Sequence, residues 1–440
     1  MKIEMPEQVK KIIDVLESAG YEAYAVGGCV RDSILGRIPA DWDITTSAKP
    51  EQVKVLFPRT IDTGIEHGTV TVMIDKTGYE VTTYRIDGEY QDGRHPVEVN
   101  FTSNLTEDLK RRDFTINAMA YNDRSGLVDV FDGAGDLERK VIRCVGDAME
   151  RFGEDALRIL RAVRFAAQLG FEIHEDTRKA AAELAGNLEQ ISAERIQTEL
   201  VKLLVSPHPQ MLRDAWEMGL TAIFLPEFDA IMETEQNNPH HMYSVGEHTL
   251  KAMEFVEPEK VLRLAVLFHD FGKPDVRQSR DGVDHFYGHA EVSRDKAAEI
   301  LRRLKFDNDT IEQVKRLVLY HDARPEANEK SVRRLMKKVG KDYFSDLLQV
   351  MGADILAQSE YKRLDKLTTL SRVTEIYEGI LERGECVSLK ELAVTGKDLI
   401  QAGMKPGKEL GVVLQSMLEE VIEDPEKNTK EYLLKQVKLS

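Results

Sequence analysis

The sequence predicts an α/β head followed by a chain that is almost entirely helical. Residues 1 to about 145 alternate helical and strand-like segments, whereas glycine and proline become rarer from residue 154 onward. Beyond that point apolar residues recur at helical spacing, as Leu157, Leu160 and Val163 do, and such a stripe marks the buried face of a helix. We therefore expect a head that mixes helices with strands and a long helical remainder.

Length and composition predict a modular, cytoplasmic protein. The 440 residues suffice for roughly three domains of about 150 residues each. No apolar run approaches the roughly 18 residues needed to span a bilayer, and the amino terminus carries no signal pattern. Three widely spaced cysteines, Cys29, Cys144 and Cys386, favour a reducing compartment over a disulfide framework. We expect no membrane partner, and the oligomeric state stays open.

The negative net charge of the chain limits how it can bind nucleic acid. A net charge of −17 disfavours broad phosphate contact, which requires a basic surface. Basic residues are nevertheless clustered at Lys110–Arg112 and at Arg158, Arg161 and Arg164. Any contact with RNA must therefore be local.

The expected elements of the head follow from the periodicity of the apolar residues. Alternation predicts strands, and an i, i+3, i+4 pattern predicts a helix. The expected helix is Gln8–Glu17, and the expected strands are Ala23–Val26, Asp41–Thr45, Thr69–Ile74 and Glu80–Arg85. Proline-containing breaks near residues 207–209, 237–239 and 324–325 separate the later helical units.

A double glycine and two alternating carboxylates form the most informative motif of the head. Gly27 and Gly28 predict a tight turn, and Val30–Leu35 predicts a short helix whose first amides can face phosphates. On the next strand Asp41 and Asp43 point to the same face, where they can hold one or two Mg²⁺ ions. A solvated turn is the alternative for an isolated pair of this kind.

Glu80 is a candidate third carboxylate. It lies on an alternating strand, Tyr79–Arg85, that can run beside the strand of Asp41 and Asp43. A third carboxylate would complete a two-metal site for transfer of a nucleotidyl group. The alternative is an exposed residue on the face of the sheet.

Asp155 and Arg158 are candidates for reading a nucleobase. Residues 154–158 are expected to start a long helix, on which these two side chains lie three residues apart. An aspartate that accepts and an arginine that donates can pair with the Watson–Crick edge of cytosine or adenine. Arg164 lies about half a turn from Asp155, so the later arginines are expected on phosphate or in structural roles. An ordinary intrahelical salt bridge is the alternative.

Several ordered motifs make residues 20 to 200 resemble the class II tRNA nucleotidyltransferases, which include CCA-adding enzymes, their A-adding and CC-adding relatives and bacterial poly(A) polymerases. The matching runs are GGCVRDSILG with DWD, RRDFTINA, EDALRILRAVRF and SAERIQTEL. The resemblance implies a head of the polymerase-beta nucleotidyltransferase type that acts on tRNA with CTP and ATP.

The resemblance also implies roles for individual residues. Asp41 and Asp43 would be ligands of Mg²⁺. The residues expected on the nucleotide are Gly28, Arg31, Arg112, Asp155, Arg158, Arg161 and Arg164, with Asp155 and Arg158 selecting CTP and then ATP. The polar segment Asp87–Asn100, which contains DGRHP, is expected to be a mobile loop near the carboxylates and looks like the flexible loop that CC-adding members lack.

A second metal site is predicted from a concentration of histidines. Seven of the 11 histidines lie between His240 and His321. Histidines and carboxylates at helix ends suit a transition metal that activates water. The order of these residues resembles the HD phosphohydrolase domain, with ligands His248, His269, Asp270 and Asp354 and possible additional ligands His289 and His321. His240, His241 and His285 match no motif position and are expected at the surface.

These motifs divide the chain into four expected regions: a head at 1–145, a neck with the nucleotide-selecting helix at 146–230, an HD domain at 231–365 and a helical tail at 366–440. We expect template-independent addition of nucleotides to tRNA together with a phosphohydrolase activity. Three alternatives stay open: A addition or poly(A) synthesis, an inactive RNA-binding head beside an active HD site, and an RNA-binding scaffold without turnover.

Overall fold

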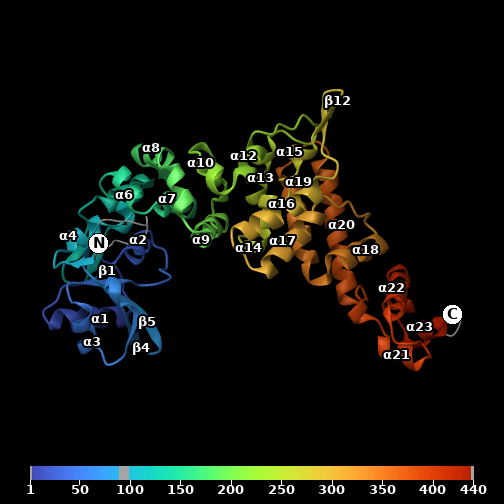
Figure 1. Cartoon of the computed structure of the whole chain (residues 1–440), viewed down its shortest axis with the longest axis horizontal. Coiled ribbons are helices and arrows are strands. Elements are labelled where there is room, and N and C mark those ends of the chain that lie inside the picture. Colours follow the sequence, from blue (N-terminus) through green and yellow to red (C-terminus); the bar gives the residue numbers. More distant parts are fainter. Residues whose placement is uncertain (1, 89–98, 438–440) are drawn as a thin grey trace. The chain divides into compact units, whose positions relative to one another are not determined.

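The computed structural model describes residues 2–88 and 99–437 and divides into two compact units, Met1–Pro226 and Glu227–Ser440. In Figure 1 the large sheet belongs to the amino-terminal part of the chain, and helices dominate from α6 onward. The predicted order of an α/β head followed by helical regions is confirmed. Two short strand pairs interrupt the helical part: β10 (Val141–Ile142) with β11 (Glu172–Ile173), and β12 (Gln278–Arg280) with β13 (Val283–His285).

The head is built on a mixed seven-stranded sheet in the order β3-β4-β5-β2-β1-β8-β9. Only the β2–β5 pair is parallel; the neighbouring pairs are antiparallel. The strands are β1 (Ala23–Val26), β2 (Ile44–Thr46), β3 (Thr60–Gly64), β4 (Thr69–Ile74), β5 (Thr77–Thr83), β8 (Ala120–Asn122) and β9 (Gly126–Val128).

Helix α1 (Glu7–Ser18) has the spacing that the sequence predicts. Its buried residues Val9, Ile12, Ile13 and Leu16 recur at i, i+3, i+4 and i+7, which is one face of a helix. This face packs on β1. The remaining helices of the head are α2 (Gly28–Ile34), α3 (Pro50–Leu56), α4 (Leu105–Lys110) and α5 (Gly133–Arg139).

Two predicted strands have different bounds in the structure. Strand β2 begins at Ile44 rather than Asp41, because β1 ends at Val26 and Gly27 turns the chain away from the sheet. Strand β5 ends at Thr83, opposite the last residue of β2. Arg85 instead opens a separate antiparallel pair, β6 (Arg85–Asp87) with β7 (Val99–Phe101).

The rest of the first unit is helical. Its helices are α6 (Ala148–Glu154), α7 (Leu157–Leu169), α8 (Glu175–Glu183), α9 (Ala193–Leu204), α10 (Leu212–Glu217) and α11 (Thr221–Phe224). A two-residue parallel pair, β10 (Val141–Ile142) with β11 (Glu172–Ile173), ties the end of the head to the turn after α7. Gly170 terminates α7 in the left-handed conformation that glycine adopts without strain.

The second unit is a helical assembly with one hairpin, β12 (Gln278–Arg280) and β13 (Val283–His285). Among the described residues, none of its helices, nor any in the first unit, is both long and apolar enough to cross a membrane. The helices are α12 (Pro226–Met232), α13 (Val245–Met253), α14 (Lys260–Phe268), α15 (Lys273–Val276), α16 (His289–Arg303), α17 (Asn308–Tyr320), α18 (Glu329–Val339), α19 (Phe344–Ala357), α20 (Arg363–Glu382), α21 (Gly396–Gln401), α22 (Lys408–Glu423) and α23 (Lys430–Val437).

Helix α14 lies at the centre of this unit. Residues 261–268 are all buried, and α13, α16, α17 and α19 pack around them. The tail has a separate small core around Leu399, Val421 and Leu433, which joins α21, α22 and α23. The division of the chain into four regions stays a prediction beside these two units.

Candidate active sites

The glycine turn of the head lies close to an arginine and has a backbone conformation that favours glycine. Gly27 has φ +81°, and a Cβ on it would lie 3.0 Å from Nη1 of Arg112. The following helix starts at Gly28, two residues earlier than predicted. Arg31 on this helix is buried; it donates to Oδ1 of Asn117 at 2.7 Å and to both carboxylate oxygens of Asp32. The turn, Arg31 and Arg112 therefore form one rigid corner.

The three predicted carboxylates lie at the edge of this corner. Ile44 on β2 pairs with Val81 on β5, and one further step of the same register sets Asp43 beside Glu80. Burial raises the pKa of Asp43 to about 6, the charges of Asp41 and Glu80 add to the shift, and Arg112 opposes it. A bound divalent cation would remove the repulsion between the negative charges of Asp41, Asp43 and Glu80. The three carboxylates therefore fit Mg²⁺.

Asp108 pairs with Arg111 and Arg112 and was missed from the sequence. It is fully buried on α4 and pairs with Arg111 at 2.8 Å and with Nη2 of Arg112 at 3.6 Å. Burial alone would raise the pKa of Asp108, but the two guanidinium groups hold it below its ordinary value. The i, i+3 and i, i+4 spacing of these residues was the available signal.

Asp155 and Arg158 line one cavity of about 250 Å³, but they do not lie on one continuous helix. Helix α6 ends at Glu154 and α7 begins at Leu157, so the prediction that the long helix starts at residue 154 and contains Asp155 is wrong. Asp155 has extended backbone angles, and its Oδ1 accepts from the Leu157 amide at 3.0 Å. An aspartate caps a helix well from this position, which is why the chain breaks here.

The later arginines have separate partners. The residues that line the cavity are Arg111, Arg112, Asp113, Asp155, Leu157, Arg158, Arg161 and Arg195. Arg161 donates to Oδ2 of Asp113, while Arg164 is paired with Glu199 at 2.8 Å and is not part of the cavity wall. Arg195, which comes from the SAERIQTEL run, donates to Oδ2 of Asp155 at 2.8 Å and is a site residue that sequence reasoning did not single out.

We expect Asp113→Asn to destabilise the first unit by about 2 kcal/mol, because it leaves Arg161 without its buried partner. Burial alone would raise the pKa of Asp113, but Arg161 and the amide of Asn117 hold it well below its ordinary value. The stabilisation is therefore complete above pH about 4, the pKa of an unfolded aspartate, and is lost as the pH falls through the lower folded value.

Tryptophan fluorescence measures this effect selectively, because the two tryptophans, Trp42 and Trp216, both belong to the first unit. Asp176→Asn, at a carboxylate with 80% of its side chain exposed, is the matched control and should change the unfolding midpoint little. An Asp113→Asn protein that unfolds at the wild-type midpoint near neutral pH would contradict this assignment.

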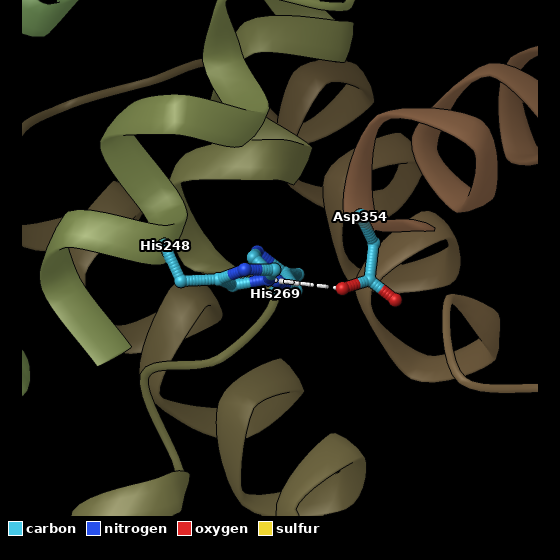
Figure 2. Close-up of side chains that lie close together, drawn as sticks. All are labelled: His248, His269 and Asp354. Atoms are coloured by element: carbon cyan, nitrogen blue, oxygen red, sulfur yellow. Dashed lines mark hydrogen bonds and ion pairs between the residues drawn. The ribbon is translucent and has the colours of Figure 1, made fainter. Parts of the chain in front are cut away.

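The second site gathers six side chains that are far apart in the sequence. His248 lies on α13, His269 and Asp270 directly follow α14, His289 begins α16, His321 follows α17 and Asp354 lies on α19. Nε2 of His248 is 2.9 Å from Oδ1 of Asp354, and Nε2 of His269 is 3.1 Å from Oδ2 of Asp270. Figure 2 shows His248, His269 and Asp354 pointing toward one another.

The backbone fixes which nitrogen of three rings carries the proton. Nδ1 of His269, His289 and His321 lies 2.6 to 2.9 Å from a main-chain carbonyl oxygen three residues earlier. A carbonyl only accepts, so each Nδ1 donates and each neutral ring presents a lone pair at Nε2. This arrangement is typical of histidines that bind metals.

Among the described residues, donor atoms of this cluster face one another without the hydrogen-bond partners that buried polar atoms normally have, as the ligands of a metal site do. Nε2 of His269 is buried without a hydrogen bond of good geometry, and Oδ2 of Asp270 has an ion pair with Nζ of Lys273 at 2.7 Å but no hydrogen bond. Nε2 of His289 lies 3.2 Å from Nε2 of His321, so two lone pairs face each other unless a cation or proton lies between them. Three ligand atoms meet within 4.8 Å in two groups of described residues, His248–His269–Asp354 and His269–Asp270–His321.

The charge balance favours a cation at this cluster. Burial alone would raise the pKa values of Asp270 and Asp354. When His269 carries a second proton, it and Lys273 hold the pKa of Asp270 well below its ordinary value, and a doubly protonated His248 does the same for Asp354; a metal ion bound to the neutral rings would supply this positive charge instead. Both carboxylates are therefore anionic. Asp41, Asp43 and Glu80 form no comparably tight three-ligand group in the part of the chain that the structure describes, so the two predicted metal centres differ in compactness.

The expectation that His240, His241 and His285 are plain surface residues is wrong. All three line the cavity of about 400 Å³ that opens onto the cluster, together with Lys366 and Arg324. His241 is half-buried, its ring is 5.2 Å from that of His248, and burial lowers its pKa to about 2. His240 and His241 lie on the loop before α13, and His285 lies on the β12–β13 hairpin. No local sequence pattern indicates that these segments lie close to the cluster.

Two predictions concern other parts of the chain. The DGRHP segment, residues 92–96, lies outside the described residues. In the tail, Thr395 and Asp398 form a capping box at the start of α21, which agrees with the predicted short helices there.

Three family models match parts of the chain. A Poly A polymerase head domain matches residues 23–143, a "probable RNA and SrmB-binding site of polymerase A" matches residues 170–232, and a putative tRNA nucleotidyltransferase domain 2 matches residues 278–437. The first match contains the carboxylates and Arg112. The third contains His289, His321 and Asp354.

Similar proteins extend over the whole chain. A CCA-adding enzyme of Lactobacillus delbrueckii is 37% identical over 96% of this chain and 95% of its own length, and one of Limosilactobacillus fermentum is 37% identical over 99% and 98%. The structure of the Bacillus stearothermophilus CCA-adding enzyme in complex with CTP is 30% identical, with a TM-score of 0.75 and coverage of 99% and 98%. A Thermotoga maritima CCA-adding enzyme complexed with tRNA, 20% identical with a TM-score of 0.58, shares the fold.

Proposed function

The chain belongs to the family of CCA-adding enzymes, and from this premise we propose how its residues add C, C and A to the 3′ end of tRNA. The grouping of Asp41, Asp43 and Glu80 beside Arg112 carries the proposal. In this reaction the 3′ hydroxyl of the RNA attacks the α-phosphate of CTP or ATP, the bond to the β-phosphate breaks, and pyrophosphate leaves.

We assign Asp41 and Asp43 as ligands of Mg²⁺, with Glu80 as the neighbouring third carboxylate. The Mg²⁺ ions supply charge neutralisation and alignment at the phosphates. Arg31 and Arg112 flank the glycine turn, and both are fixed by buried partners, Asn117 for Arg31 and Asp108 for Arg112. Such preorganised guanidinium groups bind the triphosphate without the entropic cost of ordering long side chains.

Asp155 and Arg158 are proposed to select the base. Arg195 holds one oxygen of Asp155, and the Leu157 amide holds the other. Arg158 is held by Glu154 and by the carbonyl oxygen of Arg111. Arg161 also lines this cavity, whereas Arg164 braces α7 against Glu199, and we assign Arg164 a structural role.

We expect Arg158→Ala to reduce discrimination between CTP and ATP by about tenfold, the effect of losing one good hydrogen-bonding pair. Triphosphate affinity should change less, because Arg31 and Arg112 stay in place. Single-turnover incorporation of each nucleotide onto tRNA that ends in CC measures the ratio. Arg164→Ala is the control on the same helix, and unchanged selectivity in Arg158→Ala would remove the template role.

One assay tests the proposed function as a whole. The full chain is incubated with tRNA lacking its 3′ end, labelled CTP or ATP and Mg²⁺, and the product ends are sequenced. Products that end in CCA are expected. A single A, or a run of A, would identify the A-adding or poly(A) alternatives, and no incorporation would identify an inactive RNA-binding head.

A second candidate function is metal-dependent hydrolysis at the histidine cluster, and the convergence of His248, His269 and Asp354, with Nε2 of His269 buried and without a hydrogen bond, favours it. We propose that His248, His269, Asp270 and Asp354 hold a transition metal that supplies an activated water. The proposed substrate is an RNA end that carries a phosphate or a 2′,3′-cyclic phosphate. Hydrolysis of such an end that depends on an added transition metal tests this proposal; a cluster that binds metal without turnover would make it a folded spacer.

We also propose that the protein works in the cytoplasm. The described cysteines, Cys29, Cys144 and Cys386, are free and buried, which suits a reducing compartment.

A further inference from the structure

A second cavity of about 230 Å³ adjoins the histidine cluster in the second unit. Its walls are mostly apolar, with Met351 and Ile355 on α19 and Leu370 and Val373 on α20 among the lining residues. Neither the proposed addition reaction nor the metal ligands use this cavity. An apolar cavity beside a polar reaction centre is the usual form of a ligand site.

The two cavities are adjacent, because the side chains of Arg324 and Lys366 line both of them. Gln358 links Lys366 to the cluster: its side-chain nitrogen donates to Oδ1 of Asp354 at 3.0 Å, and its oxygen accepts from Nζ of Lys366. Nζ of Lys366 also lies 3.2 Å from Nδ1 of His240. A cation therefore stands at the boundary between the metal ligands and the apolar cavity, one side chain away from Asp354.

We propose that the apolar cavity holds the nucleobase of a nucleotide whose phosphate lies at the histidine cluster. The phosphate would meet the cationic groups Lys273 and Lys366, which line the cavity of the histidine cluster. The base would enter between α19 and α20, where apolar side chains can cover its faces. Arg324 is 52% exposed, and its planar guanidinium can stack on the base at the entrance.

This proposal deepens the second candidate function and rests on it for the position of the phosphate. It assigns the base of the terminal nucleotide of that RNA end, or of a free nucleotide, to a defined cavity. It also makes α19 and α20 the determinants of specificity, while the metal ligands position the phosphate.

Two neighbouring threonines on α20 provide a matched test. Thr369 and Thr368 are both exposed, and each hydroxyl donates to the carbonyl oxygen four residues earlier at 2.9 Å. Only Thr369 lines the apolar cavity. Thr369→Trp should fill the cavity, whereas Thr368→Trp adds the same side chain outside it.

Calorimetric titrations of the full chain with Mn²⁺ present compare adenosine 3′-monophosphate with methyl riboside 3-phosphate, which has no base. Asp155→Ala and Arg158→Ala are combined as the background, so that base binding by the first unit does not contribute. We expect the background protein to prefer the nucleotide by at least about tenfold, the usual effect of one stacked base. Thr369→Trp should lose this preference, and Thr368→Trp should keep it.

Equal affinity for the two probes, or the same nucleotide affinity in both tryptophan variants, would overturn the proposal. Circular dichroism establishes that both variants keep their helices. Hydrolysis is measured separately on the wild-type chain with a 2′,3′-cyclic-phosphate RNA. A wild-type chain that binds the base in the cavity but hydrolyses nothing would refute the hydrolase function and leave the binding site intact.

Discussion

Replacing Asp41 and Asp43 together by alanine is expected to reduce nucleotide incorporation into tRNA by at least about a thousandfold. Both carboxylates are assigned to Mg²⁺, and the charge stabilisation that a metal supplies at a phosphoryl centre amounts to several kcal/mol, with each ~1.4 kcal/mol worth a factor of ten. The single Asp43→Asn variant should show most of this loss, because it keeps the shape and removes the charge. Incorporation of labelled CTP into tRNA without its 3′ end is the measurement.

Asp62→Asn is the matched control for this experiment. Asp62 lies on β3 of the same sheet and forms an ion pair with Lys54, and both side chains are substantially exposed. Exposed ion pairs contribute little to stability, so this variant should incorporate nucleotides at the wild-type rate. Incorporation that persists in the double alanine variant would refute the assignment of the head site.

The carboxylate site of the head could be predicted because its residues occur in short local sequence motifs. The glycine pair, the alternating aspartates and the strand of Glu80 each have a periodicity, and the parallel β2–β5 pair brings them to one edge. The prediction erred on where β2 begins, since this depends on the length of its partner β1. That error did not matter for the site, because extended backbone continues through Asp43, whose carbonyl oxygen accepts from the Val26 amide.

At Asp155 the sequence pattern predicted a more regular helix than the structure contains. The run EDALR matches a helix with an i, i+3 pair, yet the structure uses Asp155 as a cap between two helices. Capping competes with helix continuation whenever an aspartate can reach a free amide. Asp155 and Arg158 still line the same cavity. The position of Asp155 depends on its hydrogen bond from Arg195, which lies 40 residues later in the sequence.

The cluster of the second unit was predictable only in part. The adjacent pair His269–Asp270 and the flanking histidines gave an ordered signal, whereas His240, His241 and the apolar cavity depend on tertiary packing. The loop of residues 237–241 is held by the hairpin through Asp284, which accepts from the Asn237 amide at 2.9 Å. A contact between residues 47 positions apart cannot be predicted from the periodicity of the sequence.

The second large effect is expected from His269→Gln, which removes a ligand atom common to both three-residue groups of the cluster. Transition-metal affinity should fall by at least about a hundredfold, more than the loss of an outer-shell partner costs. Hydrolysis of a 2′,3′-cyclic-phosphate RNA should fall with it, whereas addition of C, C and A to tRNA should stay at the wild-type rate. Metal content after dialysis and the two activities are measured on the same preparations.

His285→Gln is the matched control, since His285 lines the cavity but belongs to neither ligand group. It should retain the metal. Read together with the Asp41 and Asp43 variants, these results test whether the chain holds two independent centres: each set of substitutions should remove one activity and spare the other. A His269→Gln protein that keeps both its metal and its hydrolysis would place the reaction elsewhere. Loss of CCA addition in a folded His269→Gln protein would instead mean that the two centres are coupled, because no atom of His269 belongs to the nucleotide site of the head.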